Sequence, residues 1–181
     1  MPTMTAPTSA GLLLHRTGPA GLEVFLGRMG GPLWTRRPRA WSIPKGLHTA
    51  QEAPLDAARR EFEEEIGVPA PDLDYRLLGA FRQSSGKIVT VFAGAGGDDV
   101  RFAASNTFEL EWPRGSGVVR EYPEIEAADW MSAARARTEI VAGQLPALDA
   151  LEAGLRSGPA SSGTSGTDAS SSERTTGPRS R

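Results

Sequence analysis

The chain has 181 residues, of which 39% are hydrophobic and 23% charged, and its formal net charge is −2. These values are typical of one soluble domain with its own core, and they give no sign of a surface that coats nucleic acid or binds membranes. The chain contains no cysteine, which excludes a disulfide framework, a thiolate nucleophile and a cysteine-ligated zinc site.

The first residues show no targeting pattern. Residues 1–9 are rich in Pro and Thr, and the first apolar run, residues 11–14, is far too short to span a membrane. We therefore expect a flexible leader at residues 1–7, a cytoplasmic location, no membrane partner and no stable binding of nucleic acid.

Five elements are predicted in the first half of the domain. The apolar run at 10–16 and the alternating run at 22–28 predict two strands joined by a Gly/Pro turn. A loop rich in Gly, Pro and Arg follows at 30–39, and then a brief extended segment at 41–44. A helix is predicted at 54–66, because Pro54 suits a first helical turn and Gly67 suits the residue after the last turn.

In the second half of the domain, apolar and polar residues alternate less regularly. Strands are predicted at 75–83 and 87–93 across a Ser-Ser-Gly turn, at 106–112 from clear alternation, and at 127–131. Ser132 is a plausible N-cap for a helix that ends near Val141, and a last helix is predicted at 147–155. Residues 157–181 contain no Leu, Ile, Val or aromatic residue, which predicts a disordered tail after a domain at 8–156.

The helix at 54–66 carries an unusual concentration of glutamates. Glu61, Glu64 and Glu65 stand at i, i+3 and i+4 and share one face, whereas Glu63 falls on the solvent face. A third, apolar stripe predicts the core contact; its members are Leu55, Ala58, Phe62 and Ile66. The alternative interpretation is that these glutamates form an ordinary solvent-exposed acidic face, as they do in most Glu-rich helices. Three clustered carboxylates repel one another unless a cation lies among them, and hard oxygen ligands suit Mg²⁺ or Mn²⁺. The pattern predicts a metal site for phosphate chemistry.

The stretch from Gly46 to Val68, GLHTAQEAPLDAARREFEEEIGV, resembles the Nudix box, G-x5-E-x7-R-E-U-x-E-E-x-G-U, where U is a bulky apolar residue. Every specified position is filled, and an aromatic residue at position 62 is the mildest departure. The matching residues are Gly46, Glu52, Arg60, Glu61, Phe62, Glu64, Glu65, Gly67 and Val68.

The resemblance implies an α/β fold, the Nudix α/β/α sandwich with a mixed β-sheet, over residues 8–156. It also implies a hydrolase that uses Mg²⁺, or Mn²⁺, to cleave a nucleoside diphosphate linked to another group. The lead-in at 41–46, Trp-Ser-Ile-Pro-Lys-Gly, is similar to that of enzymes acting on dinucleoside polyphosphates and nucleoside triphosphates. The partner implied is a small-molecule nucleotide. The alternative is a non-catalytic nucleotide-sensing module, although such modules usually lose box carboxylates.

The same resemblance assigns roles within the box. Gly46, through its carbonyl, and the carboxylates of Glu61, Glu64 and Glu65 are implied as metal ligands, with Glu64 also catalytic. Arg60 is implied either to pair with Glu52, which holds the ligand helix in register, or to contact phosphate.

Further candidates lie outside the box. Glu124 stands six residues before Trp130, a spacing similar to that of an additional ligand or base in relatives; Glu121 and Glu126 are the alternatives. Four more residues are candidates for substrate binding, with ordinary surface or packing roles as the alternative: Lys45 and Lys87 as point charges, Arg82 as a fork and Trp34 as a stacking surface for a base.

Overall fold

The computed structural model describes residues 8–158, so the expected leader at 1–7 and the expected tail beyond residue 158 lie outside the described residues. Among residues 8–158, no helix is both long and apolar enough to cross a membrane. The strands are β1 (Thr8–Gly18), β2 (Gly21–Met29), β3 (Trp41–Ser42), β4 (Lys45–Leu47), β5 (Arg76–Arg82), β6 (Ile88–Ala95), β7 (Thr107–Glu111), β8 (Val119–Pro123) and β9 (Ile125–Ser132). The helices are α1 (Pro54–Ile66), α2 (Ala133–Glu139), the 3₁₀ turn η1 (Ala142–Gln144) and α3 (Leu145–Ser157).

The main sheet is mixed, as predicted. Its order is β3-β2-β1-β6-β5, with β9 added beside β2 and β4 beside the first residues of β1. Strands β1 and β6 run parallel, whereas the other pairs are antiparallel. The predicted hairpin of β1 and β2 is confirmed, with Gly18 opposite Gly21 at its turn. The sheet therefore places β4 and the start of β6 on either side of the start of β1.

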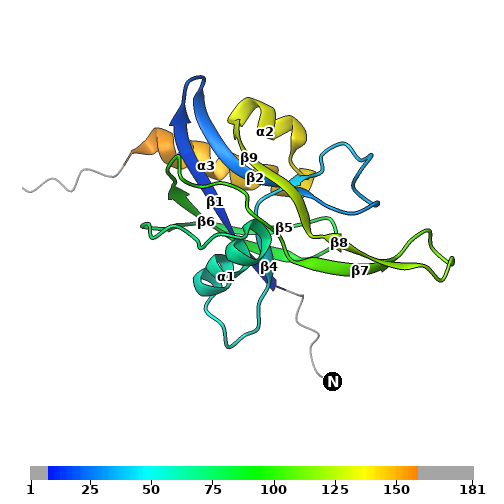
Figure 1. Ribbon diagram of the computed structural model, residues 1–181. Helices are drawn as coiled ribbons and strands as arrows, with labels where there is room; N and C mark the ends of the chain where they lie inside the picture. Colours follow the sequence, from blue (N-terminus) through cyan, green and yellow to red (C-terminus); the bar gives the residue numbers. More distant parts are fainter. Residues whose placement is uncertain (1–7, 159–181) are drawn as a thin grey trace, which may run out of the picture.

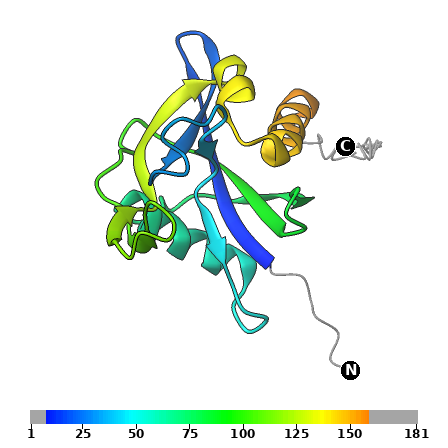
Figure 2. The ribbon, with the colours of Figure 1, turned by 90° about the vertical axis from the view of Figure 1, so that its right-hand side faces the viewer.

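Alternation along β1 divides the core into two layers. Ala10, Leu12 and Leu14 face α1, whereas Leu13 faces the layer that contains α2 and α3. Figure 2 shows α1 on one side of the sheet and the two C-terminal helices on the other. This arrangement confirms the predicted α/β/α sandwich.

Helix α1 has the predicted bounds. Pro54 lies in its first turn, and Gly67 ends it with φ 81° while its N–H donates to the Glu63 carbonyl at 2.8 Å. Ala58, Phe62 and Ile66 of the predicted core stripe are buried, Leu55 is partly buried, and Glu63 is exposed as expected. Packing of this stripe against β1 fixes which helix face the acidic residues occupy.

Two strands were not predicted. Strand β4 pairs with β1 inside the box, and β8 pairs with β7 in a two-stranded hairpin that projects from the main sheet (Figure 1). β4 has only three residues, too few for a period, and β8 (VREYP) contains charged residues and a proline. Strand β9 also begins two residues before the predicted start, and α3 extends two residues beyond the predicted helix at each end.

Candidate functional site

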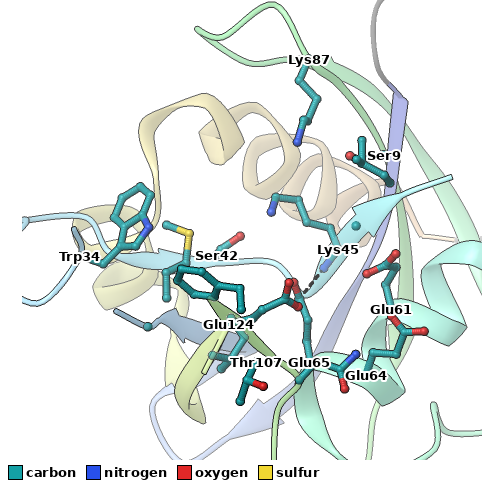
Figure 3. Close-up of a pocket in the computed structure, with 17 residues that line it drawn as sticks. Ser9, Trp34, Ser42, Lys45, Glu61, Glu64, Glu65, Lys87, Thr107 and Glu124 are labelled. Carbon is teal, nitrogen blue, oxygen red and sulfur yellow. Dashed lines mark hydrogen bonds between the residues drawn. The ribbon is translucent and has the colours of Figure 1, made fainter. Parts of the chain in front are cut away.

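An open pocket of about 570 Å³ lies where β4, α1 and the first residues of β1 meet the β7–β8 hairpin. Gly46 and the glutamates of the acidic face line it, as do four residues proposed from outside the box (Figure 3). The predicted residues that line it are Gly46, Glu61, Glu64, Glu65, Glu124, Lys45, Lys87 and Trp34. The fold therefore brings these predicted residues together, although up to 90 positions separate them in the chain.

Arg60 is the centre of a carboxylate network beside the pocket. Its Nε donates to Glu52 Oε1 at 2.9 Å and its Nη2 to Glu52 Oε2 at 3.1 Å, a bidentate pair. Its Nη1 donates to Glu61 Oε1 at 2.8 Å and to both oxygens of Glu64 at 3.2 Å. Nη2 also donates to the Leu47 carbonyl at 3.1 Å, which ties α1 to β4. Arg60 and Glu52 are therefore paired in the structure, and their bracing role stays a prediction.

The three glutamates of the acidic face differ in burial. Glu61 and Glu65 are buried, with 9% and 8% of their surfaces exposed, whereas Glu64 is half-buried. Glu65 Oε2 accepts a hydrogen bond from the Lys45 backbone N–H at 2.8 Å. Burial raises the pKa of Glu65 to about 7, and burial also raises the pKa of Glu61. Nearby carboxylates, including Glu124, add to both shifts, whereas Arg60 lowers the pKa of Glu61 and Lys45 lowers that of Glu65. A bound cation would favour the charged form of both carboxyl groups.

The backbone at Gly46 packs directly against the carboxylate of Glu61. A Cβ built on Gly46 would lie 1.8 Å from Glu61 Oε2 and 2.0 Å from its Cδ, so only glycine allows this approach. Strand β4 and helix α1 are thus in direct contact through Gly46 and Glu61.

The donor set suits a hard divalent cation, although the side chains are not gathered around one point. Among residues 8–158, no group of three or more Asp, Glu, His or Cys side chains converges closely enough to hold a metal ion as it stands. Nη1 of Arg60 instead lies between Glu61 and Glu64 and takes the place of a cation. Carboxylate oxygens are the hard donors that divalent ions such as Mg²⁺ and Mn²⁺ prefer, so the residues present fit such an ion.

Glu124 differs from the two alternatives proposed beside it. It lies between β8 and β9, lines the pocket, and its backbone N–H donates to the Asn106 carbonyl at 2.8 Å. Glu121 instead accepts a hydrogen bond from Thr107, and Glu126 forms an ion pair with Arg28 at 2.5 Å. Neither alternative lines the pocket, so Glu124 is the carboxylate that this segment contributes.

The proposed substrate-binding residues differ in whether they line the pocket. Trp34 lines the pocket, and the Arg37 guanidinium lies 5.3 Å from the centroid of its ring. Arg82 is exposed, and its Nη1 donates to the Gly86 carbonyl at 3.4 Å. Arg82 is not among the residues that line the pocket, so the geometry gives it no contact with a ligand there.

Sequence reasoning missed several lining residues. Ser9 is the second residue of β1, Thr107 and Phe108 begin β7, and Asn106 directly precedes β7. The backbone N–H of Asn106 donates to the Glu64 carbonyl at 2.9 Å, which fastens the hairpin to the end of α1. These positions depend on strand pairing across the molecule, and no local pattern signals them.

Replacement of Gly46 by alanine tests the contact with Glu61. We expect metal affinity and kcat to fall by about 10- to 100-fold in Gly46→Ala, because the new methyl group displaces the Glu61 carboxylate. The melting temperature should change little, since a side chain and not a backbone segment has to move. Titration of Mn²⁺ and steady-state kinetics measure both quantities; wild-type metal affinity in the variant would contradict this account.

The pKa of Glu65 predicts a pH dependence of stability in metal-free protein. Its folded value of about 7 lies above the ordinary 4.5, so the folded state holds a proton that the unfolded state releases between these values. Stability should therefore decrease as pH rises through this window, by up to about 3 kcal/mol from Glu65 alone. Thermal melts of wild type and Glu65→Gln in EDTA check this: the difference between them should widen toward pH 7, and a difference independent of pH would contradict it.

The fold and the pocket define an α/β/α sandwich with an acidic helix face at an open cleft, and comparison with known proteins agrees. The NUDIX domain family model matches residues 7–151. The chain belongs to the Nudix family.

Similar proteins include the RNA pyrophosphohydrolase of Halorhodospira halophila (strain DSM 244 / SL1), 43% identical over 56 residues, or 30% of each chain. The mRNA-decapping protein g5R of African swine fever virus (isolate Pig/Kenya/KEN-50/1950) is 48% identical over 44 residues, 24% of this chain and 17% of that protein. The matches thus span less than a third of these curated relatives.

Solved structures share the fold at low identity. A binary complex of C. elegans Ap4A hydrolase superposes with a TM-score of 0.57 at 20% identity, covering 84% of this chain and 99% of that one. The NUDIX domain of Shewanella oneidensis NrtR complexed with ADP ribose gives 0.56 at 13% identity, covering 84% and 90%.

Proposed function

We propose that this protein is a pyrophosphohydrolase that uses Mg²⁺, or Mn²⁺, to cleave a phosphoanhydride bond of a nucleotide by attack of water. The observation that carries the proposal is the pocket in which the Nudix-box carboxylates and Glu124 come together. The partial matches to an RNA pyrophosphohydrolase and an mRNA-decapping protein support the same reaction class.

We assign the cation to Glu61, Glu64, Glu65 and the carbonyl of Gly46. When bound, the ion neutralises phosphate charge, polarises the phosphoryl group and lowers the pKa of water. Arg60 and Glu52 position the acidic face through their bidentate pair; a contact of Arg60 with phosphate is the alternative.

Glu124 is the residue proposed to accept a proton from the attacking water. It is exposed to the pocket, and no hydrogen bond or ion pair within the described range engages its side chain, so its carboxylate is available as a base. Trp34 offers its ring as a surface on which a nucleobase stacks.

The substrate class proposed is a dinucleoside polyphosphate or a nucleoside triphosphate, ahead of nucleotide sugars. A panel of all three classes, assayed with Mg²⁺ and with EDTA, tests this. We expect kcat/KM for the polyphosphates to exceed that for nucleotide sugars by about tenfold or more, because additional phosphates add charge-assisted contacts, and we expect EDTA to abolish turnover. Preference for a nucleotide sugar would overturn the substrate class, and full activity in EDTA would overturn the metal assignment.

A further inference from the structure

The position of Glu124, the proposed base, depends on its backbone. Among residues 8–158, no hydrogen bond or ion pair engages its carboxylate, which lines the pocket (Figure 3). Its N–H donates to the Asn106 carbonyl at 2.8 Å, and its carbonyl accepts from the Gly30 N–H at 2.9 Å. A catalytic group has to be placed closely, because a shift of about 1 Å can cost about a hundredfold in rate. The contacts that fix this backbone therefore also fix the base.

The segment 103–106 joins Glu124 to the end of α1. Its first two N–H groups donate to the Ile66 carbonyl at 2.9 and 3.2 Å, and the Asn106 N–H donates to the Glu64 carbonyl at 2.9 Å. Both carbonyls belong to the last turn of α1, where helix carbonyls lack partners within the helix. Asn106 thus has one backbone hydrogen bond to a proposed metal ligand and another to the proposed base.

Ser105 adds a side chain to this link. Its Oγ accepts a hydrogen bond from the Ile125 N–H at 3.0 Å and donates to the Asn106 carbonyl at 3.1 Å. The same carbonyl accepts the Glu124 N–H, so the hydroxyl completes a small network around Glu124. A hydroxyl that donates and accepts at once strengthens both bonds. The hydrogen bonds of Ser105 are also the ones in this network that a side-chain substitution can remove.

Strand β9 is irregular beside this point. Ala127 and Ile125 are opposite consecutive residues of β2, so β9 has one extra residue between them, a β-bulge. Bulges disrupt the ladder of hydrogen bonds locally, and they occur often next to active sites, where they redirect a side chain. Regular pairing with β2 is thus interrupted next to Glu124, and a contact from outside the sheet, such as that of Ser105, has a larger part in fixing it.

We propose that Ser105 is a positioning residue that holds Glu124 at a fixed place relative to the acidic face of α1. This inference rests on the proposed function and deepens it, because it identifies what keeps the base and the metal ligands in register although they come from different elements. Ser105 is not among the residues that line the pocket, and it acts through the Ile125 N–H and the Asn106 carbonyl.

Kinetics with ATP and Mg²⁺ test this role. Ser105→Ala should lower kcat by about 10- to 100-fold, because Glu124 loses its fixed position, and should change KM by less than about twofold. Ser105→Thr keeps the hydroxyl and should retain kcat within about threefold. Ser116→Ala is the matched control: the Ser116 Oγ also accepts a backbone N–H, that of Val118 at 3.1 Å, in the loop that joins β7 to β8. It should keep the wild-type kcat.

A double-mutant cycle with Glu124→Gln separates positioning from a general structural role. If Ser105 acts through Glu124, Ser105→Ala should lower the residual kcat of Glu124→Gln by less than about twofold. The same loss in both backgrounds, or wild-type kcat in Ser105→Ala, would overturn the proposal. An equal loss in Ser116→Ala would also overturn it, since any loosening of the hairpin would then lower kcat.

Amide hydrogen exchange, followed by NMR in metal-free protein, tests the positioning without catalysis. Ser105→Ala should speed exchange at Glu124 and Ile125 by about tenfold, because both N–H groups belong to the network that loses its hydroxyl, whereas Ser116→Ala should leave both unchanged. Unchanged exchange at Glu124 in Ser105→Ala would overturn the positioning role.

The two proposals fail separately. If wild type hydrolyses no nucleotide, the proposed function is wrong, and amide exchange still decides whether Ser105 holds Glu124. If wild-type turnover is normal but Ser105→Ala behaves like wild type in kcat and in exchange at Glu124, only the positioning role is wrong.

Discussion

Glu65→Gln and Glu64→Gln should each lower kcat by more than about a hundredfold while the fold persists. Substitutions that only orient metal ligands already cost about 10- to 100-fold, so loss of a ligand should cost more. Glu65 is buried beside the Lys45 backbone N–H, and Glu64 shares Nη1 of Arg60 with Glu61. Steady-state kinetics at saturating substrate and Mg²⁺, with circular dichroism to verify the fold, measure the effect.

Glu63→Gln is the matched control, because it makes the same chemical change on the exposed face of the same helix. It should retain kcat within about twofold, as surface substitutions have small effects. If Glu64→Gln and Glu65→Gln both kept near-normal activity, the assignment of the acidic face to the cation would be wrong; an equal loss in Glu63→Gln would mean that helix charge alone matters.

The second large effect concerns the packing of α1, the helix that carries the acidic face. Phe62→Ala should destabilise the fold by about 3–5 kcal/mol, because truncation of a buried phenylalanine loses apolar burial and leaves a cavity. Phe62 is completely buried, and its ring centroid lies 6.1 Å from that of Phe25 on β2. For a domain of this size the melting temperature should fall by about 10 °C. Thermal or urea unfolding measures the loss.

Phe62→Leu separates the volume of this side chain from its hydrophobicity. Leucine has the aliphatic character typical of this box position and should cost about 1 kcal/mol. A loss in Phe62→Ala below about 1 kcal/mol would show that α1 is not held by this contact, and that another part of the apolar stripe fixes the acidic face.

The elements with strong local signals were predictable from the sequence. The helix at 54–66 has a proline in its first turn, a glycine with positive φ after its last turn and an apolar stripe of period 3.6. These three signals indicate the same start and end of the helix. β4 and β8 were missed because they exist only through pairing: β4 with the start of β1, and β8 with β7. Pairing between distant parts of the chain produces no clear residue pattern in segments of three to five residues.

The same distinction applies to the site. Box spacing placed Glu61, Glu64 and Glu65 on one helix face, and that face lines the pocket. Lys45, Lys87 and Glu124 were proposed from type and spacing, and they reach the pocket through three different strand connections. Ser9 and Asn106 had no such signal. Serine and asparagine are common. Burial without a hydrogen-bond partner distinguishes Ser9, and the backbone hydrogen bond to the Glu64 carbonyl distinguishes Asn106.

Hydrolysis in ¹⁸O-labelled water tests the central claim most directly. Wild-type protein would be incubated with ATP and with a dinucleoside tetraphosphate, with Mg²⁺ or with EDTA, and the products analysed by mass spectrometry. The account predicts one ¹⁸O in one phosphate product of each cleavage, only with Mg²⁺, and loss of this product in Glu65→Gln. Tight nucleotide binding without labelled product in any condition would contradict it, and would instead indicate a nucleotide-sensing module on the same fold.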